Sequence, residues 1–401
     1  MQTAPKSLRL HIGIFGRRNV GKSSLLNAIA RQSVSIVSDR PGTTTDPIEK
    51  PMELLPLGPV VFIDTAGIDD EGDLGELRKK RSESALDRID LGLVVVEPDA
   101  WTPFEDALLK EFKVRGVPAL AAINKSDLQQ PTAKFVSGIE AKGCAVAVCS
   151  AATGAGLAEL REAMLRLLPD DWLGCRHLVS DLVPTGQVAL LVAPIDKSAP
   201  KGRLILPQVM AMRDLLDGGA LGLVCQASDL AAALASLKAP PAIVVTDSQA
   251  FHEVERGLPP DIPLTSFSIL MARFQGDLAA LAEGARAISR LKAGDRVLIQ
   301  ETCTHHATDD DIGKVKLPAW LTKAAGAPLR FDHSSGKDFP ADASPYALVV
   351  HCGNCMGARR EMLSRINKCF AAGVPITNYG MAIAHSLGIL DRAMRPFQGQ
   401  G

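Results

Sequence analysis

The 401-residue chain has almost no net charge and no cluster of basic residues. Lys and Arg total 44 against 45 Asp and Glu, and aromatic residues make up only 4% of the chain. A nucleic-acid binder usually carries a basic patch, joined by aromatic side chains where it binds single-stranded RNA. The composition therefore argues against nucleic acid as a partner.

Long apolar runs are also absent from the sequence. No stretch of about 18 apolar residues occurs, which is the length that a membrane-spanning helix needs. The first residues, MQTAPKSLRLHIGIFG, show no charged start followed by a long apolar stretch and a cleavage site. We expect a cytoplasmic protein with no membrane contact. In that reducing compartment, the eight cysteines are expected to be metal ligands or core residues rather than disulfides.

The N-terminal part of the chain alternates apolar, β-branched stretches with helical ones, and no internal repeat or low-complexity segment interrupts it. This order is typical of a doubly wound α/β domain with a parallel sheet. The predicted strands lie at residues 8–16, 60–67, 91–97, 117–124 and 144–151.

The same strand-then-helix order recurs after a Pro/Gly/Asp-rich segment near residue 170. Apolar stretches at 188–194, 221–226 and 242–247 alternate with Ala/Leu-rich helices, and a third group begins near residue 293. We therefore predict an α/β protein in which a P-loop domain is followed by two further α/β domains. The predicted domains are residues 1–170, 175–290 and 291–401.

A phosphate-binding loop supplies the strongest motif in the sequence. Residues 16–23 read GRRNVGKS, which matches G-x-x-x-x-G-K-[ST] between a predicted strand and a predicted helix. In such a loop the backbone N–H groups turn toward the phosphates, Lys22 lies against the β- and γ-phosphates, and the Ser23 hydroxyl binds Mg²⁺. The remaining predicted phosphate-site residues are Gly16, Val20, Gly21 and Ser24.

Two further motifs extend this assignment from a nucleoside triphosphate to GTP. The segment DTAG ends a strand, so Asp64 can reach Mg²⁺ through water and the Gly67 N–H can contact the γ-phosphate. The segment NKSD, Asn124 to Asp127, follows the strand at 117–124. The Asp127 carboxylate can accept two hydrogen bonds from the guanine N1–H and N2–H₂ groups. Adenine does not offer that pair.

Three cysteines near the C-terminus have the spacing of metal ligands. Cys303-x-His305 is followed, after 45 intervening residues, by His351-Cys352-x-x-Cys355. Cys352 and Cys355 can bind one metal centre, and Cys303 adds a third thiolate if its strand is a neighbour of theirs. Because successive side chains of a strand point to opposite faces, His351 is a ligand only if the chain turns there.

Three interpretations of this cysteine group stay open. A 4Fe-4S cluster on three thiolates would leave one iron with a weak or exchangeable ligand. A structural zinc would be closed by His305 or His351. In the third interpretation the cysteines are small core residues, as we expect for the five without ligand spacing, which are Cys144, Cys149, Cys175, Cys225 and Cys369.

With these motifs, residues 8–168 resemble the translation-factor-like GTPases of the TrmE–Era–Der group. The resemblance implies that Ser150 and Ala151 lie over the guanine oxygen and that PGTTTD, residues 41–46, is switch I. There, Thr44 is the expected Mg²⁺ ligand, with Thr43 as the alternative. Asn19 resembles the asparagine that marks potassium-activated members of the group. No glutamine follows Gly67, so the residue that orients the attacking water is unassigned, with Glu71 a weak candidate.

The whole chain resembles one family, the FeFe-hydrogenase maturation GTPases called HydF. The segment PIDKSAPKGRLILPQV in the middle and the terminal C-x-H and H-C-x-x-C motifs carry this resemblance. It implies a GTP-hydrolysing scaffold that binds a 4Fe-4S cluster, with Cys303, Cys352 and Cys355 as its thiolates. In that family the scaffold receives a di-iron precursor from two radical-SAM maturases and delivers it to apo FeFe-hydrogenase, and the middle domain forms a homodimer.

Two other functions compete with this one. A ribosome-assembly or tRNA-modification GTPase would carry a zinc-binding C-terminal domain, but the near-neutral charge disfavours an RNA-binding appendage. An iron–sulfur electron carrier with a vestigial nucleotide site is disfavoured because Lys22, Ser23, Asp64 and the N-K-x-D segment are all intact.

Overall fold

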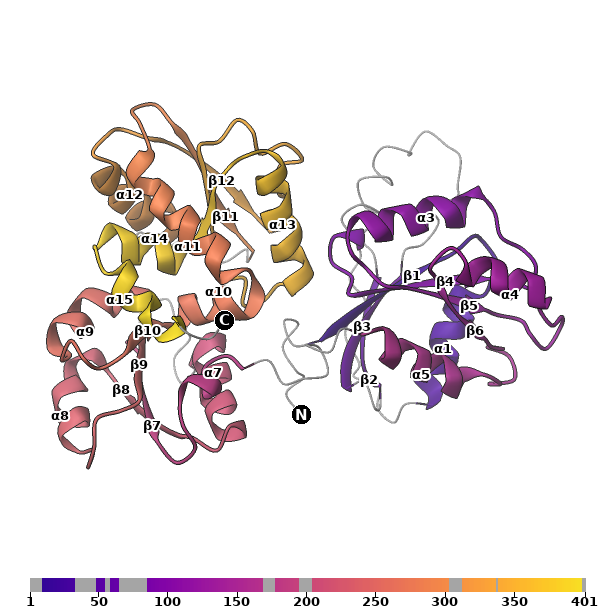
Figure 1. Cartoon of the computed structure of the whole chain (residues 1–401), viewed down its shortest axis with the longest axis horizontal. Helices are drawn as coiled ribbons and strands as arrows, with labels where there is room; N and C mark the ends of the chain where they lie inside the picture. The colour runs from indigo at the N-terminus through magenta and orange to yellow at the C-terminus, as the bar shows by residue number, and fades with distance from the viewer. Residues whose placement is uncertain are drawn as a thin grey trace. The chain divides into compact units, whose positions relative to one another are not determined.

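The computed structural model contains three β-sheets, which belong to two compact units, Met1–Cys175 and Arg176–Gly401 (Figure 1). It describes residues 9–32, 48–54, 58–64, 85–168, 177–194, 204–302, 312–336 and 338–398. Within these ranges, no helix combines the length and the apolar composition that crossing a membrane requires.

The first unit is built on a six-stranded sheet in the order β2-β3-β1-β4-β5-β6. All described strands of this sheet run parallel except β2, which pairs antiparallel with β3. The strands are β1 (Leu10–Phe15), β2 (Ile48–Leu54), β3 (Gly58–Asp64), β4 (Leu91–Val96), β5 (Ala119–Ile123) and β6 (Ala145–Val148). The five strands predicted from the sequence are confirmed.

Strand β2 is absent from the sequence prediction. Its sequence, IEKPMEL, contains three charged residues and a proline, and neither feature is typical of a buried strand. Proline has no backbone N–H to donate to a neighbouring strand. Pro51 is compatible with β2 because this strand lies at the edge of the sheet and has no neighbour on one side.

Helices cover both faces of this sheet, as the doubly wound prediction requires (Figure 1). Side chains of α1 (Lys22–Gln32) and α5 (Leu157–Leu167) share one core with Ile12. Side chains of α3 (Pro103–Val114) and α4 (Ala133–Glu140) share the other with Phe15. Residues of β1 therefore contribute to both cores, and every residue of the strand is buried.

The second unit contains two parallel four-stranded sheets. The first has the order β10-β9-β7-β8, with β7 (Val188–Val192), β8 (Leu221–Cys225), β9 (Ile243–Thr246) and β10 (Leu264–Ser266). The second has the order β12-β11-β13-β14, with β11 (Arg296–Glu301), β12 (Arg330–Ser335), β13 (Leu348–His351) and β14 (Ile376–Asn378). The fold class predicted from the sequence, a P-loop domain followed by further α/β sheets, is confirmed.

The two sheets of the second unit share a hydrophobic core. Leu190 of β7 and Val244 of β9 belong to the same buried cluster as Leu298 of β11 and Val349 of β13. The helices around them are α7 (Leu206–Asp217), α8 (Leu230–Ala235), α9 (Phe251–Gly257), α10 (Phe267–Gln275), α11 (Leu278–Arg286), α12 (Leu317–Ala325), α13 (Arg359–Ala371), α14 (Tyr379–Ser386) and α15 (Leu390–Met394). The domain boundaries drawn from the sequence stay predictions.

Three of the cysteines without ligand spacing are core residues, as expected. Cys144, Cys149 and Cys369 are fully buried or nearly so, and burial raises the pKa of each thiol to about 12. Cys225, on the edge strand β8, is only half-buried, and Cys175 lies outside the described residues.

Candidate functional site

The phosphate-binding loop closes around the side chain of Lys22. Its ammonium group donates hydrogen bonds to the carbonyl oxygens of Gly16 and Arg17, the latter at 2.8 Å. A Cβ at Gly16 would lie 2.3 Å from the Val95 carbonyl oxygen, so only glycine fits there. Asn19 adopts a left-handed conformation with φ 65°. The predicted loop is thus formed directly between β1 and α1.

Asn124 joins the phosphate loop to the base-recognition segments. Its Nδ2 donates to the Val20 carbonyl oxygen at 3.0 Å, and its Oδ1 accepts from the Ala151 N–H at 2.9 Å. The Ser150 hydroxyl in turn donates to the Asp127 carboxylate. The buried Asn124 side chain therefore links the phosphate loop, the NKSD segment and residues 150–151, which the sequence motifs predict to bind one nucleotide.

These segments line a cavity of about 480 Å³. The predicted residues Gly21, Ser24, Asn124, Lys125, Asp127 and Ala151 are in its wall, together with Asn27, Ala28, Leu128 and Ala152, which the sequence analysis did not name. The additional residues come from the next turn of α1 and from positions adjacent to the motifs. Helical spacing from Ser24 is the signal that points to Asn27 and Ala28.

The magnesium side of this site is described only in part. Ser23 follows Lys22 in the first turn of α1. Asp64 is the last residue of β3 and pairs with Ile14 of β1, which places it at the same sheet edge as the phosphate loop. Thr43, Thr44 and Gly67 lie outside the described residues.

Arg17 and Glu105 form a contact that the sequence analysis missed. Arg17 Nε donates to Glu105 Oε1 at 3.0 Å, and Nη2 donates to the Ala100 carbonyl oxygen at 2.8 Å. Glu105 is fully buried and also accepts from the Thr102 N–H at 2.7 Å, which completes a capping box on α3. The T-x-x-E spacing signals the cap. It does not reveal the arginine, which comes from the phosphate loop.

The C-terminal cysteine motif lies where two neighbouring parallel strands end. Strands β11 and β13 pair, with Gln300 opposite His351. The Cys352 N–H donates to the Gln300 carbonyl oxygen at 2.9 Å, and the Thr302 N–H donates to Cys352 Sγ at 3.2 Å. The strand neighbourhood that the sequence argument required for Cys303 is therefore present, although Cys303 and His305 themselves lie outside the described residues.

The segment after Cys352 turns sharply around Asn354. Asn354 is buried with φ 52°, accepts from the Thr302 hydroxyl at 2.9 Å and donates to the Ala358 carbonyl oxygen at 3.0 Å. A Cβ at Gly357 would lie 2.1 Å from Asn354 Oδ1, so glycine is required there. Cys355 packs against the core that contains Leu191 and Met271, so the middle segment of the chain helps to hold the cysteine loop, residues 352–358.

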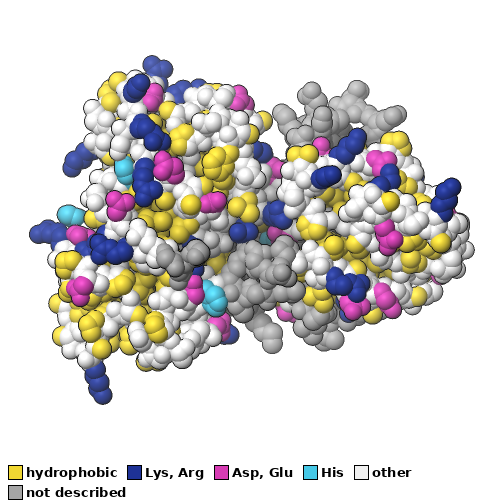
Figure 2. Space-filling view, in the orientation of Figure 1, with side chains coloured by type: hydrophobic (Ala, Val, Ile, Leu, Met, Phe, Trp, Pro, Cys, Tyr) yellow, Lys and Arg dark blue, Asp and Glu magenta, His cyan; other side chains and the backbone are white. Residues whose placement is uncertain are grey.

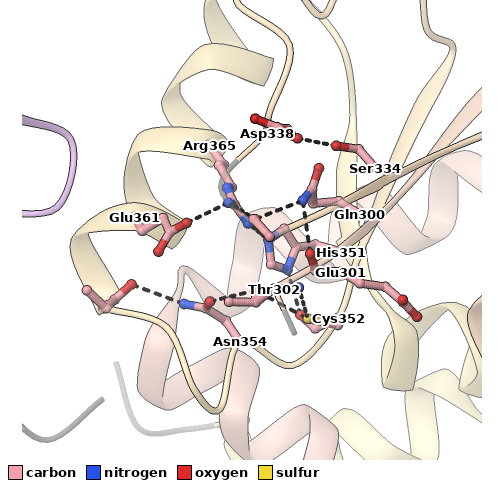
Figure 3. A network of polar contacts seen from close by, with 12 residues as sticks. Gln300, Glu301, Thr302, Ser334, Asp338, His351, Cys352, Asn354, Glu361 and Arg365 are labelled. Atoms are coloured by element: carbon pink, nitrogen blue, oxygen red, sulfur yellow. Dashed lines mark hydrogen bonds and ion pairs between the residues drawn. The ribbon is translucent and has the colours of Figure 1, made fainter. Parts of the chain in front are cut away.

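His351 is fully buried and points toward α13 rather than toward Cys352 Sγ (Figure 3). Its Nδ1 lies 2.7 Å from the Cys352 carbonyl oxygen, and its Nε2 lies 2.5 Å from Arg365 Nη1. Burial and the adjacent Arg365 charge lower the pKa of His351 to about 3, so the ring is neutral. Metal binding by His351 stays a prediction, but it would require the ring to give up one of these partners.

The cysteine loop supplies two thiolates, Cys352 and Cys355, from one tight turn. The Thr302 N–H donates to Cys352 Sγ, as backbone N–H groups do to the sulfurs of iron–sulfur sites. Among the described residues no three His, Cys, Asp or Glu side chains gather as metal ligands. Cys303, the third predicted thiolate, is the next residue after Thr302 and lies outside these residues.

The glycine-rich loop closed around Lys22, held by the asparagine of an N-K-x-D segment, defines the first unit as a P-loop GTPase domain. A family model described as 50S ribosome-binding GTPase matches residues 11–125. Models described as the hydrogen maturase F dimerization and tetramerization domains match residues 178–276 and 279–396. The chain belongs to the hydrogen maturase F (HydF) family, as the sequence resemblance implied.

Two curated relatives each match about 160 residues of the chain. GTPase Der of Solidesulfovibrio magneticus is 36% identical over 162 residues, which are 40% of this chain and 36% of Der. The tRNA modification GTPase MnmE of Synechococcus sp. (strain RCC307) is 39% identical over 160 residues, 39% of this chain and 33% of MnmE. The chain thus spans about a third of the length of these relatives.

A solved structure also matches part of the chain. The crystal structure of Era from Aquifex aeolicus with bound GDP·AlF₄⁻ shares 29% identity over 40% of this chain and 57% of that one, with a TM-score of 0.34.

Base selection by Asp127 can be tested by one substitution. Asp127→Asn should lower the rate with GTP and raise it with xanthosine triphosphate, whose edge presents a carbonyl where guanine has an amino group. Steady-state hydrolysis with both nucleotides and with ATP measures this preference. Equal hydrolysis of ATP and GTP by the unmodified protein would contradict the assignment.

Proposed function

We propose that this chain is a GTP-hydrolysing scaffold in the maturation of FeFe-hydrogenase. In this proposal it holds a 4Fe-4S cluster on Cys303, Cys352 and Cys355 and delivers a di-iron precursor, made by radical-SAM maturases, to the apo-hydrogenase. The observation that carries the proposal is the contact between Thr302 and Cys352 Sγ. It brings the end of the C-x-H strand beside the H-C-x-x-C loop in a chain whose family is hydrogen maturase F.

In the nucleotide site, each residue has a defined task. Lys22 and the loop N–H groups would neutralise the phosphates, and Ser23, Thr44 and Asp64 would hold the Mg²⁺ ion that counters the charge of the β- and γ-phosphates. Gly67 contacts the γ-phosphate, and Asp127 selects guanine. Removal of the γ-phosphate releases the switch contacts made by Thr44 and Gly67, which is how such domains alter distant interactions.

In the cysteine site, Cys303, Cys352 and Cys355 would hold the cluster, and a cluster held by three thiolates would supply an iron open to an exchangeable ligand, where the di-iron precursor could bind. The chain's own contribution is to fix the thiolates: the Thr302 N–H donates to Cys352 Sγ, and Asn354 holds the turn that separates Cys352 from Cys355.

The RNA-directed alternative receives less support. The tRNA modification relatives match about 160 residues, which are 39% of the chain. The hydrogen maturase F models match residues 178–396 almost continuously. A zinc ion in the cysteine loop is nevertheless a distinct chemical outcome, and metal analysis separates it from a cluster.

Self-association, which the family's dimerization and tetramerization domains suggest, is best supported at β8. This strand lies at the end of its sheet, so among the described strands it has a neighbour on one side only. Leu221 and Val224 of β8 are 55% and 42% exposed, and Leu216 at the end of α7 is 68% exposed. A bare strand edge beside apolar side chains favours pairing with a second copy.

Loss of one thiolate should abolish iron binding without abolishing GTP hydrolysis. Cys352→Ser should remove most of the iron, since a serine oxygen is a poorer ligand for these irons than a thiolate. GTP hydrolysis should stay within a few-fold of the parent because the nucleotide site has its own core. Conversely, Lys22→Ala should keep the iron and lose hydrolysis, and neither variant should activate apo-hydrogenase in an assay that contains the other maturases.

Cys225→Ser is the matched control for this experiment, because Cys225 lies in the same unit on β8. It should retain iron, hydrolysis and activation. Full iron content in Cys352→Ser would reject the cysteine loop as the cluster site.

Potassium dependence tests the role of Asn19. If its side chain helps to bind K⁺, hydrolysis should be faster in K⁺ than in Na⁺, and Asn19→Gly should abolish the difference. Glycine is the suitable replacement because Asn19 has a positive φ, which glycine adopts without strain. The same rate in both salts for the parent protein would remove this role.

Introducing positive charge on β8 tests whether this strand edge is the self-association interface. Leu221→Lys combined with Val224→Lys should lower the molar mass measured by light scattering, because buried, unpaired ammonium groups oppose pairing of two edges. Val114→Lys, at an 82% exposed position in the first unit, is the control and should leave the mass unchanged. An assembly that keeps its mass in the double variant argues for another interface.

A further inference from the structure

We propose that Arg365 and His351 form a positioning pair that fixes the Cys352 peptide and thereby orients its thiolate. This inference deepens the proposed function and rests on it, since it assigns a task beside the cluster to two residues that need not touch the metal. Arg365 lies on α13, thirteen residues beyond Cys352, and nothing in the sequence motif points to it.

The Arg365 guanidinium is held in one orientation by contacts on several sides (Figure 3). Nη2 donates to Glu361 Oε1 at 2.6 Å and to the Gly336 carbonyl oxygen at 3.0 Å, while Nη1 faces His351 Nε2 at 2.5 Å. Its Cζ lies 5.5 Å from the centre of the Phe339 ring. Only 3% of Arg365 is exposed. The guanidinium is planar and its N–H groups point in fixed directions. These contacts therefore fix the direction in which Nη1 donates to His351.

The direction of each hydrogen bond through His351 follows from its neighbours. Arg365 can only donate, so His351 Nε2 accepts and carries the lone pair. The Cys352 carbonyl oxygen can only accept, so Nδ1 carries the proton and donates to it at 2.7 Å. A single neutral tautomer satisfies both contacts. The chain of donors therefore runs from Arg365 through His351 to the backbone of Cys352.

The hydrogen bonds from Arg365 through His351 complete the anchoring of the Cys352 backbone. Its N–H is already bonded to the Gln300 carbonyl oxygen across the sheet, and its carbonyl is bonded to His351. With the peptide planes on both sides of the Cα anchored, the Cβ direction is set, and Sγ lies 3.2 Å from the Thr302 N–H. Loss of a residue that supports a metal ligand typically costs about 10–100-fold in metal affinity.

The test is a double-mutant cycle on cluster retention. Arg365→Met, His351→Leu and the double variant are reconstituted with ferrous iron and sulfide, and iron release to an excess of chelator is followed. Each single change should speed release about tenfold, the lower end of what loss of an outer-shell partner costs. The double variant should release iron no faster than the singles, because both residues act through the same carbonyl. The EPR spectra of the reduced single variants should match each other.

Conservative and matched variants separate positioning from general stability. His351→Gln offers both a hydrogen-bond donor and an acceptor and should therefore release iron as slowly as the parent. Arg365→Lys lacks the planar guanidinium with its paired N–H donors and should release iron fast. Arg296→Met, which removes an arginine paired with Asp332 elsewhere in the same sheet, should behave as the parent. Arg365→Met combined with Glu361→Gln avoids an unpaired carboxylate and should release iron as fast as Arg365→Met alone.

A measurement on the metal-free protein tests the same inference even if the proposed function is wrong. In the apoprotein, amide hydrogen exchange in residues 352–358 should be faster in Arg365→Met and His351→Leu, and equally so, but unchanged in Arg296→Met. A parent protein that takes up no iron would refute the proposed function alone. Release and exchange at parental rates in Arg365→Met, or multiplicative effects in the double variant, would overturn the positioning pair. An EPR change confined to the His351 variant would make His351 a ligand.

Discussion

The carboxyl ends of neighbouring parallel strands lie at one edge of a sheet, and both sites of this protein depend on that constraint. In the second unit, the register of β11 against β13 sets Gln300 opposite His351, so the residues that follow each strand must meet. Thr302 and Cys352 do meet, at 3.2 Å. Two motifs separated by some fifty residues of sequence become one site because the strands are adjacent and run in the same direction.

The same geometry builds the nucleotide site in the first unit. The phosphate loop follows β1, Asp64 ends β3, Asn124 follows β5, and Ser150 follows β6. The buried Asn124 amide then joins three of these ends by hydrogen bonds to Val20 and Ala151. Loss of one such bond between buried partners costs on the order of 1–3 kcal/mol. The loops are therefore positioned by the sheet and fixed by side chains.

Sequence patterns predicted what strong local signals carry. The buried strands, the P-loop and the cysteine spacing all depend on short-range periodicity or on motifs, and the fold class follows from them. The neighbourhood of β11 and β13 was only a condition in the sequence argument, and the structure supplies it. The strands β2, β10 and β12 escaped the sequence prediction, because β2 contains Pro51 and charged residues, β10 has only three residues, and β12, RFDHSS, is mostly polar. The strand argument that His351 points away from Cys352 agrees with its contacts.

What the sequence did not reveal are partners chosen by packing. Arg365 meets His351 because α13 lies across β13, and Arg17 meets Glu105 because α3 begins beside the phosphate loop. Neither pair has a spacing rule that identifies it. Each pair joins a helix to a loop or strand end and has at least one buried side chain, and only the three-dimensional arrangement brings the partners together.

The central claim is that the edge formed by β11 and β13 holds an iron–sulfur cluster in a chain that also hydrolyses GTP. Metal and sulfide analysis of the anaerobically purified protein, together with its absorption spectrum, tests this most directly. The account predicts a brown protein with about four iron and four sulfide per chain. A colourless protein that contains stoichiometric zinc and no sulfide would contradict it.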